Sequence, residues 1–148
     1  MQLAQLNIAR AQAPLDSPLL KEFVDNLGYI NGLAENSPGF IWRLQDESGD
    51  ATSIQLFDDP NFIVNLSVWE SVDTLKDFIF KTHHVEFLKR RYEWFDKMEQ
   101  ASHVMWWVQE NHVPTVQEAL ERLSRLRDVG DSAYAFGFRA TKYHSGID

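Results

Sequence analysis

The chain has 148 residues, of which 44% are hydrophobic and 13% aromatic, a composition that suits one domain with a hydrophobic core. Its formal net charge of −8 disfavours nucleic acids and anionic membrane surfaces as partners, because both carry negative charge. The absence of cysteine excludes disulfides, thiolate catalysis and cysteine-ligated metal centres. No apolar run is long enough for a signal peptide or a membrane-spanning helix, so we expect a soluble, cytoplasmic protein.

Four segments of alternating or continuous apolar character predict the strands of a sheet. In chain order they are residues 2–10, 40–45, 61–69 and 102–109. After the helix-start sequence Asp16-Ser17-Pro18, apolar residues at three- and four-residue spacing predict a helix, which ends at residues 36–39. Two further helical segments, residues 71–80 and 84–98, separate the third strand from the fourth.

The rest of the chain forms a polar connection and a C-terminal extension. Residues 46–60 are rich in Asp, Ser and Gly, and a short extended piece is expected at residues 53–57. The extension comprises a helix at residues 115–128 and a short strand at residues 133–139. The order β-α-β-β-α-β, followed by a helix and a strand, predicts an α+β, ferredoxin-like fold with an antiparallel sheet, in a single domain of residues 1–148.

Both faces of the predicted sheet carry large apolar side chains. In the second strand Phe40, Trp42 and Leu44 alternate with Ile41, and the third and fourth strands show the same pattern. A face open to water would instead carry polar residues at every second position. The second face therefore needs a cover, and a second copy of the chain in a two-fold homodimer is the simplest one. The alternative is that the C-terminal helix folds back over this face.

Several strand residues are candidates for a ligand site. Asn7, Asn65 and Ser67 interrupt apolar strands, and polar groups inside a sheet need partners. The two amides either face a ligand or are satisfied within the core or a dimer contact. Trp69 and Trp107 could form the aromatic wall of a pocket for a flat hydrophobic ligand, or they could be ordinary core residues.

Two arginines and a tyrosine are further candidates for ligand binding. Arg43 is alone among apolar strand residues, and Arg91 is in register with the apolar side of its predicted helix. Either guanidinium could hold a carboxylate. For Arg91 the alternative is a solvated charge run with Lys89 and Arg90, in which its stem covers apolar surface. Tyr92 could donate a hydrogen bond to a bound ligand.

Metal and nucleotide chemistry lack support in the sequence. Glu110 and His112 follow the fourth strand and could form an acid–base pair. Histidines and carboxylates do not recur at the spacing of metal ligands, so we predict no dedicated metal. Glycine-rich phosphate-binding loops and serine-hydrolase motifs are absent as well.

The third strand ends in Trp69-Glu70-Ser71, and Leu75 and His83 follow in the next helical segment. This pattern resembles a signature of the dimeric α/β-barrel superfamily, whose best-known branch is the antibiotic-biosynthesis monooxygenases. The chain also resembles the family called domain of unknown function 3291, in residues 3–9, 38–44, 65–71, 105–108 and 112–115. The resemblance implies a dimeric barrel and brings no assigned activity.

The superfamily resemblance also implies roles for single residues. Many monooxygenase-like members carry a histidine beside the pocket fourteen residues after the tryptophan, where this chain has His83. Imidazole can act as an acid, a base or a metal ligand, although an exposed histidine at a helix start is the alternative. The other common histidine position is Phe78 here, which speaks against a two-histidine mechanism. In haem-degrading relatives an asparagine of the first strand faces the ligand, and Asn7 lies where that residue would be.

Three functions follow from these observations. A cofactor-poor, monooxygenase-like enzyme acting on a small aromatic or hydrophobic molecule would use Asn7, Trp69 and His83. A haem protein would use His83 or His84 as the axial ligand. A non-enzymatic module would bind a small hydrophobic molecule or assemble through its sheet. The sequence favours a small-molecule-binding barrel, with the monooxygenase-like reading ahead of haem binding and no cofactor predicted.

Overall fold

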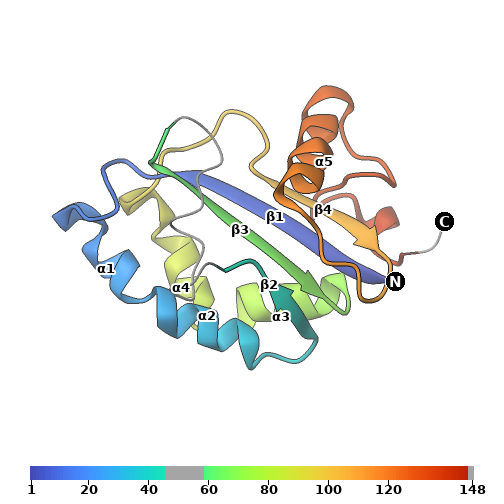
Figure 1. Cartoon of the computed structure of the whole chain (residues 1–148), viewed down its shortest axis with the longest axis horizontal. Helices are drawn as coiled ribbons and strands as arrows, with labels where there is room; N and C mark the ends of the chain where they lie inside the picture. Colours follow the sequence, from blue (N-terminus) through green and yellow to red (C-terminus); the bar gives the residue numbers. More distant parts are fainter. Residues whose placement is uncertain (46–58, 147–148) are drawn as a thin grey trace.

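The computed structural model describes residues 1–45 and 59–146, so the extended piece expected at residues 53–57 lies outside the described residues. An antiparallel sheet of order β2-β3-β1-β4 forms the centre of the described part (Figure 1). Its strands are β1 (Gln2–Arg10), β2 (Phe40–Arg43), β3 (Phe62–Trp69) and β4 (His103–Val108). This strand order confirms the predicted α+β, ferredoxin-like fold, in which a third strand lies between the two strands of each β-α-β unit.

The first helical region occupies the predicted place but is broken. A 3-10 turn (Pro18–Leu20) leads into α1 (Lys21–Asp25), and α2 (Leu27–Glu35) follows after Asn26. The Asn26 side chain donates to the Glu22 carbonyl at 2.7 Å, so it satisfies an end carbonyl of α1 and separates the two helices. The predicted helix is therefore correct in position and wrong in continuity.

The second helical region departs further from the prediction. α3 (Val72–Lys81) begins with a capping box between Ser71 and Thr74. α4 (His84–Lys89) ends nine residues before the predicted end at residue 98, and only a 3-10 turn (Arg91–Glu93) follows. Trp94 and Phe95 are buried, and their backbone pairs with the end of β1 through Gln12 and Ala11. Pairing with a strand end and burial of two aromatic rings thus override the helical periodicity of this segment.

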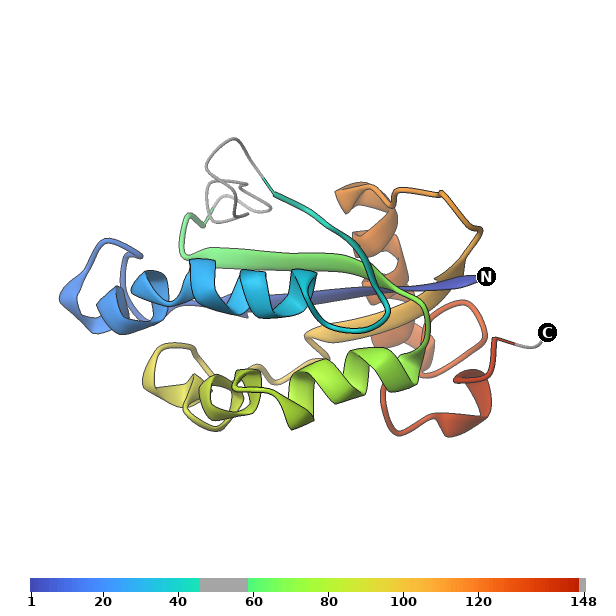
Figure 2. The same cartoon turned by 90° about the horizontal axis from the view of Figure 1, so that it is seen from below.

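The sheet has helices on both faces (Figure 2). The helix-facing side, covered by α2, α3 and α4, carries an apolar cluster that includes Leu3, Trp69, Phe78 and Met105. A second apolar cluster closes the far end of this side. It contains Ala11, Leu20, Trp94 and Phe95, with Phe23 and Phe87 against them.

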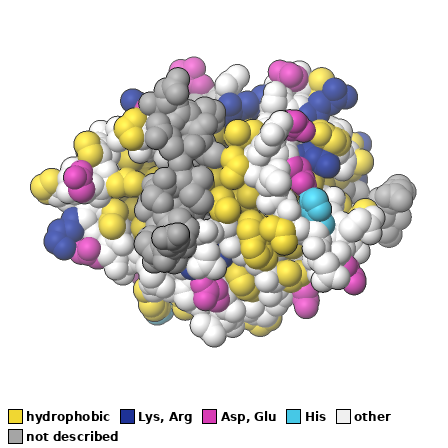
Figure 3. Space-filling model, in the orientation of Figure 1, with side chains coloured by type: hydrophobic (Ala, Val, Ile, Leu, Met, Phe, Trp, Pro, Cys, Tyr) yellow, Lys and Arg dark blue, Asp and Glu magenta, His cyan; other side chains and the backbone are white. Residues whose placement is uncertain are grey.

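The opposite face is covered in part by α5 (Val116–Val129). The Thr115 hydroxyl caps this helix by accepting from the Glu118 N–H at 3.0 Å. Ala119, Leu123 and Leu126 pack against side chains of β1, β3 and β4. The alternative cover considered from the sequence, the C-terminal helix, therefore accounts for this part of the face. Apolar side chains still reach the surface on this side of the molecule (Figure 3), and self-association through it stays a prediction.

The chain after α5 lines the outer edge of β4. Phe136 is fully buried, and its backbone forms two hydrogen bonds with Met105. The strand predicted at residues 133–139 is therefore wrong, because this segment makes one bridge and then turns into a 3-10 helix (Thr141–Tyr143). Within the described residues, no helix has the length and apolar character that crossing a bilayer requires.

Candidate functional site

A row of polar side chains crosses the middle of the helix-facing side of the sheet. Strand register places Asn7 beside both Asn65 and His103, and it places Gln5 beside Ser67. Side chains of directly opposed residues share one face of a sheet, and this face is the one that carries Leu3 and Trp69. We call these five residues, Gln5, Asn7, Asn65, Ser67 and His103, the polar row.

Three hydrogen bonds connect four members of the polar row, and a fourth joins Ser67 to Trp69. The Gln5 Nε2 group donates to Asn65 Oδ1 at 2.6 Å and to Ser67 Oγ at 2.7 Å. Ser67 Oγ also accepts from the indole Nε1–H of Trp69 at 2.9 Å. Gln5 Oε1 lies 3.0 Å from Nε2 of His103. Because Gln5 and Ser67 are 4% and 5% exposed, these bonds satisfy groups that would otherwise be buried without partners.

The polar row is buried at one end and accessible at the other. Asn7 and Asn65 are exposed, although both lie in the middle of long strands on the side that the helices cover. Apolar clusters close this side at both ends of the sheet, around Trp69 at one end and around Trp94 at the other. The helical layer is therefore open above the two asparagines, and it exposes polar groups between two apolar walls. Small-molecule sites commonly have this composition.

His103 is held as a neutral imidazole. Burial lowers the pKa of His103 to about 4, because the charged form loses its solvation. Its ring stacks on Phe138 with centroids 4.7 Å apart and an interplanar angle of 11°. His103 therefore acts at neutral pH as a hydrogen-bonding group without charge.

His83 lies at the surface and away from the polar row. It stands at the N-cap position of α4 without a capping side-chain hydrogen bond, and its Nδ1 is hydrogen bonded to the hydroxyl of Tyr29 on α2. The adjacent His84 packs its ring on Phe78 with centroids 4.9 Å apart, and its Nδ1 lies 3.2 Å from the Ile79 carbonyl. Burial lowers the pKa of His84, and the hydrogen bond to this carbonyl opposes the shift. Both rings are engaged by neighbouring protein groups, and these contacts give no support to the haem hypothesis.

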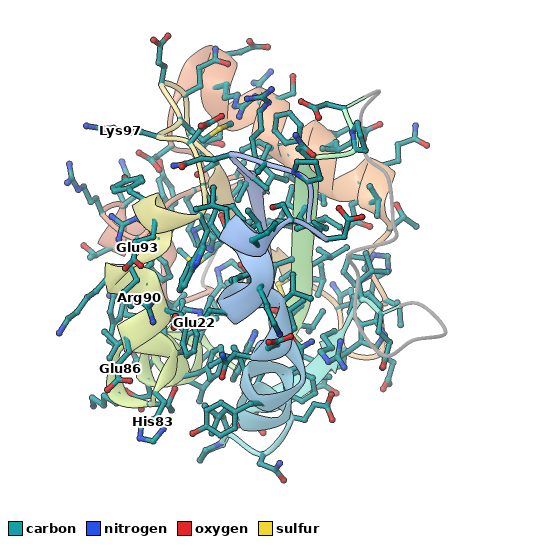
Figure 4. All side chains as sticks on the ribbon, turned by 90° about the vertical axis from the view of Figure 1, so that its left-hand side faces the viewer. Glu22, His83, Glu86, Arg90, Glu93 and Lys97 are labelled. Carbon is teal, nitrogen blue, oxygen red and sulfur yellow. The ribbon has the colours of Figure 1, made fainter. Side chains whose placement is uncertain are left out.

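The bond between Tyr29 and His83 is a polar link between α2 and the start of α4. Another polar link is an ion pair in which the Arg90 guanidinium contacts both carboxylate oxygens of Glu22 and also binds Glu93 (Figure 4). These hydrogen bonds raise the pKa of Arg90 and lower the pKa values of Glu22 and Glu93. The two halves of the helical layer are thus joined by polar links at the surface.

Of the other predicted ligand-binding residues, Arg43 borders the polar row, whereas Arg91 and Tyr92 lie away from it. Arg43 is opposite Ser67 on β2 and so shares the helix-facing side, but its Nε is bonded to Glu35 on α2 at 2.8 Å. Arg91 and Tyr92 are exposed beyond the end of β1. The Arg91 Nη1 donates to the Leu88 carbonyl at 2.6 Å, and the guanidinium lies 4.6 Å from the Tyr92 ring centre. Arg91 thus lies in solvent next to Lys89 and Arg90, which is the alternative to a ligand-binding role.

The two tryptophans have different surroundings. Trp69 is 1% exposed, stacks on Phe78 and meets Phe40 edge to face, so it is a core residue that also supports Ser67. Trp107 donates from Nε1 to the Tyr143 carbonyl at 2.8 Å, so the C-terminal segment covers it. Trp69 therefore belongs to the site through Ser67, whereas the C-terminal segment separates Trp107 from the accessible asparagines.

The acid–base pair expected after β4 has a different carboxylate. His112 is bonded to Glu118 on α5 at 2.7 Å, and Glu118 also accepts from Trp106 at 2.9 Å. Burial raises the pKa of Glu118, but the hydrogen bonds from His112 and Trp106 outweigh it, so the net shift is downward. This pair lies on the α5 side of the sheet, opposite the polar row. In the described part of the chain, no three His, Asp or Glu side chains are grouped as metal ligands would be.

Sequence reasoning missed Gln5 and His103. Gln5 alternates correctly with the apolar residues of β1, and His103 opens β4, so both look like ordinary strand residues. They are 98 positions apart, and only the pairing of β1 with β4 brings them together. The one available signal was that Gln5 shares its parity with Asn7.

Comparison with solved structures identifies the class of fold. The chain is similar to SnoaB, a cofactor-independent oxygenase from Streptomyces nogalater, with 13% sequence identity and a TM-score of 0.49. The match covers 74% of this chain and 95% of that chain. A variant of that protein with one asparagine replaced by alanine gives a TM-score of 0.52 at 13% identity, and the match covers 77% of this chain and 98% of that chain. A proposed antibiotic biosynthesis monooxygenase from Chloroflexus aurantiacus J-10-fl gives a TM-score of 0.48 at 16% identity, and the match covers 76% of this chain and 98% of that chain. At such identities the likeness shows a shared fold.

The fold is thus shared with the cofactor-independent oxygenase SnoaB, and it is the α+β, ferredoxin-like fold that the sequence predicted. Residues 2–147 match the family described as domain of unknown function (DUF3291), and the chain belongs to this family. Comparison with curated proteins finds no match.

Proposed function

We propose that this protein is a cofactor-poor, monooxygenase-like enzyme that binds a small aromatic substrate over the polar row. The observation that carries the proposal is the exposure of Asn7 and Asn65 on the helix-covered side of the sheet, between two apolar clusters. A folded chain rarely leaves amides accessible inside such a layer unless they meet a ligand or water. The fold shared with a cofactor-independent oxygenase supports the same reading.

In such a reaction the substrate itself supplies the electrons. An anthrone, for example, gives a quinone and water with dioxygen as the oxidant: one oxygen atom becomes the new carbonyl and the other leaves as water with the two methylene hydrogens. The protein has to bind the ring, orient it and stabilise the negative charge that develops on its oxygen as the methylene proton leaves. We assign this task to Asn7 and Asn65, which have apolar clusters on either side of them.

His83 and Arg43 are assigned no direct contact with the substrate in this proposal. His83 is linked to Tyr29 at the rim of the helical layer, so a role in proton transfer requires a water chain or a movement of α4. The neutral imidazole nearest to the asparagines is His103. Arg43 is engaged by Glu35 and is assigned no contact with substrate.

Oxygen uptake with anthrone as the substrate tests this proposal. Dioxygen consumption and quinone absorbance are followed for the wild type, Asn65→Ala, Asn7→Ala and the control Gln117→Ala, which removes an exposed amide on α5. Loss of a hydrogen-bond donor to a developing oxyanion typically lowers kcat by about 100-fold or more, and we expect this for Asn65→Ala. Turnover that is equal in Asn65→Ala and Gln117→Ala would contradict the proposal.

A non-enzymatic binding module would use the same groups, so the test also separates these two functions. A protein that binds anthraquinone at the polar row, yet adds nothing to the background oxidation of anthrone, is a binding module.

For self-association we propose the face of the sheet that α5 partly covers, where Trp42 and Phe62 pack at the margin of the apolar cluster beneath α5. Native mass spectrometry gives the subunit count, and a monomer at all concentrations would contradict the homodimer.

A further inference from the structure

The hydrogen bonds of the polar row have a direction that begins at His103. The atom of Gln5 that faces His103 is Oε1, and an amide oxygen can only accept. Nε2 of His103 must therefore carry the hydrogen. The imidazole is neutral, because burial lowers its pKa to about 4, so Nδ1 is the nitrogen without a proton. Stacking on Phe138 holds the ring in this orientation.

The direction continues from Gln5 to Asn65. With its oxygen committed to His103, Gln5 turns its NH2 group toward Asn65 Oδ1 and Ser67 Oγ. Ser67 Oγ accepts this bond and also the one from the indole N–H of Trp69, and its own O–H could donate to a reversed amide, so the contact with His103 sets the direction. Asn65 is thus held by its oxygen, and its Nδ2 group lies on the other side of the same planar amide. Among the described residues, Nδ2 of Asn65 has no hydrogen-bond partner.

We propose that His103 and Gln5 are positioning residues that make Asn65 a hydrogen-bond donor, so the site selects ligands with an acceptor oxygen, a ring carbonyl or a phenolate. The inference rests on the proposed function for the location of the ligand and adds its chemical class. A donor amide stabilises negative charge on a ring oxygen, whereas the reversed amide would repel it. The side chain of Asn7, which has no partner among the described residues, lies directly opposite and can add a second donor.

The tautomer of His103 gives the first test. Nitrogen-15 NMR of the ring at neutral pH distinguishes a proton on Nε2 from a proton on Nδ1. The expected result is a neutral imidazole protonated at Nε2. An Nδ1 tautomer would overturn the proposal, because Nε2 would then accept and Gln5 would present its NH2 group to His103.

Ligand selectivity gives the second test, with three probes of matched shape. Fluorenone carries only an acceptor, carbazole only a donor, and fluorene neither. We expect the wild type to bind fluorenone about tenfold more tightly than fluorene, a difference of about 1.4 kcal/mol, and to bind carbazole no better than fluorene. Preference for carbazole over fluorenone would overturn the proposal, because it is the signature of the reversed amide.

Two variants separate positioning from a structural role. His103→Phe keeps an aromatic ring against Phe138 but removes the donor, so Gln5 is free to turn and the ratio of fluorenone to fluorene affinity should fall toward one. Asn65→Asp keeps the shape and the acceptor for Gln5 but loses the Nδ2 donor, so it should lower the ratio as well. An unchanged ratio in the folded variants would refute the positioning role.

These outcomes distinguish the inference from the function on which it rests. If none of the three probes binds the wild type, the proposed site is wrong, and the tautomer of His103 still decides the direction of the hydrogen bonds. If fluorene and fluorenone bind equally and anthrone is oxidised, the proposed function stands and the acceptor selectivity fails. The control Gln117→Ala should leave all three affinities unchanged.

Discussion

The hydrogen bond between Ser67 and Trp69 gives a stability prediction whose size follows from the structure. The Trp69 ring is 1% exposed, and its indole N–H donates to Ser67 Oγ at 2.9 Å. The change Ser67→Ala removes this acceptor and leaves the N–H buried without a partner. Gln5 also loses a bond to Ser67 but keeps Asn65 as an acceptor. A buried group left unsatisfied lowers the free energy of unfolding by about 1–3 kcal/mol, so we expect about 2 kcal/mol.

A double-mutant cycle isolates this term from the rest of the substitution. Trp69→Phe removes the donor, so Ser67→Ala should be less destabilising in that background by about 1 kcal/mol or more. Urea unfolding followed by circular dichroism measures both differences. A loss of 2 kcal/mol moves the urea midpoint by about 1 M at a typical slope of about 2 kcal/mol per M. Equal destabilisation by Ser67→Ala in both backgrounds would refute the reasoning.

Three further predictions concern the core, the helix link and pH. Phe136→Ala removes a fully buried ring and should lower the free energy of unfolding by about 3–5 kcal/mol in urea melts, whereas a near-neutral effect would show that the C-terminal segment is dispensable. Arg90→Met should lower stability at neutral pH and flatten its fall in acid, in urea melts at each pH. The lowered pKa values of Glu22 and Glu93 mean that their contribution is present at neutral pH and is lost as the pH falls through values below 4.5. High salt should mimic the variant. For His103 the folded pKa of about 4 lies below the 6.5 of the free side chain, so the unfolded chain takes up the proton first. Stability should therefore fall by about 3 kcal/mol as the pH drops from 6.5 toward 4, and His103→Gln should remove that slope in urea melts at each pH.

The strands could be predicted from the sequence because each signal is local. Residues 2–10 alternate, and β1 has the bounds Gln2–Arg10. The apolar run that ends at Trp69 marks β3 within one residue. The Ser71 start of α3 was also readable, since a capping residue precedes an apolar periodicity.

The errors arise where a distant contact decides the local structure. The helical pattern of residues 84–98 ends early because Trp94 and Phe95 pack beside β1. The apparent strand at residues 133–139 is a single bridge because Phe136 is drawn into the core against Met105. Periodicity alone carries no information about such partners.

The candidate site was predictable in part for the same reason. Asn7 and Asn65 stand out as polar residues in apolar strands, and the structure brings them together on the helix-facing side. Gln5 and His103 become visible only when the register of β1 with β4 is known. Arg91 looked inward on a helical wheel, but the helix ends before it. Side-chain direction thus depends on element ends, which the sequence defines poorly.

Ligand binding over Asn7 and Asn65 is the feature on which the proposed function and the direction of the hydrogen bonds both bear most directly. The most direct measurement is a titration of the labelled protein with fluorenone, followed through the side-chain amide signals in nitrogen-15 NMR spectra. We predict saturable shifts of the Asn65 and Asn7 amide signals, with the Gln117 signal on α5 unchanged. Shifts confined to α5, or unaltered Asn7 and Asn65 signals at saturating fluorenone, would contradict the account.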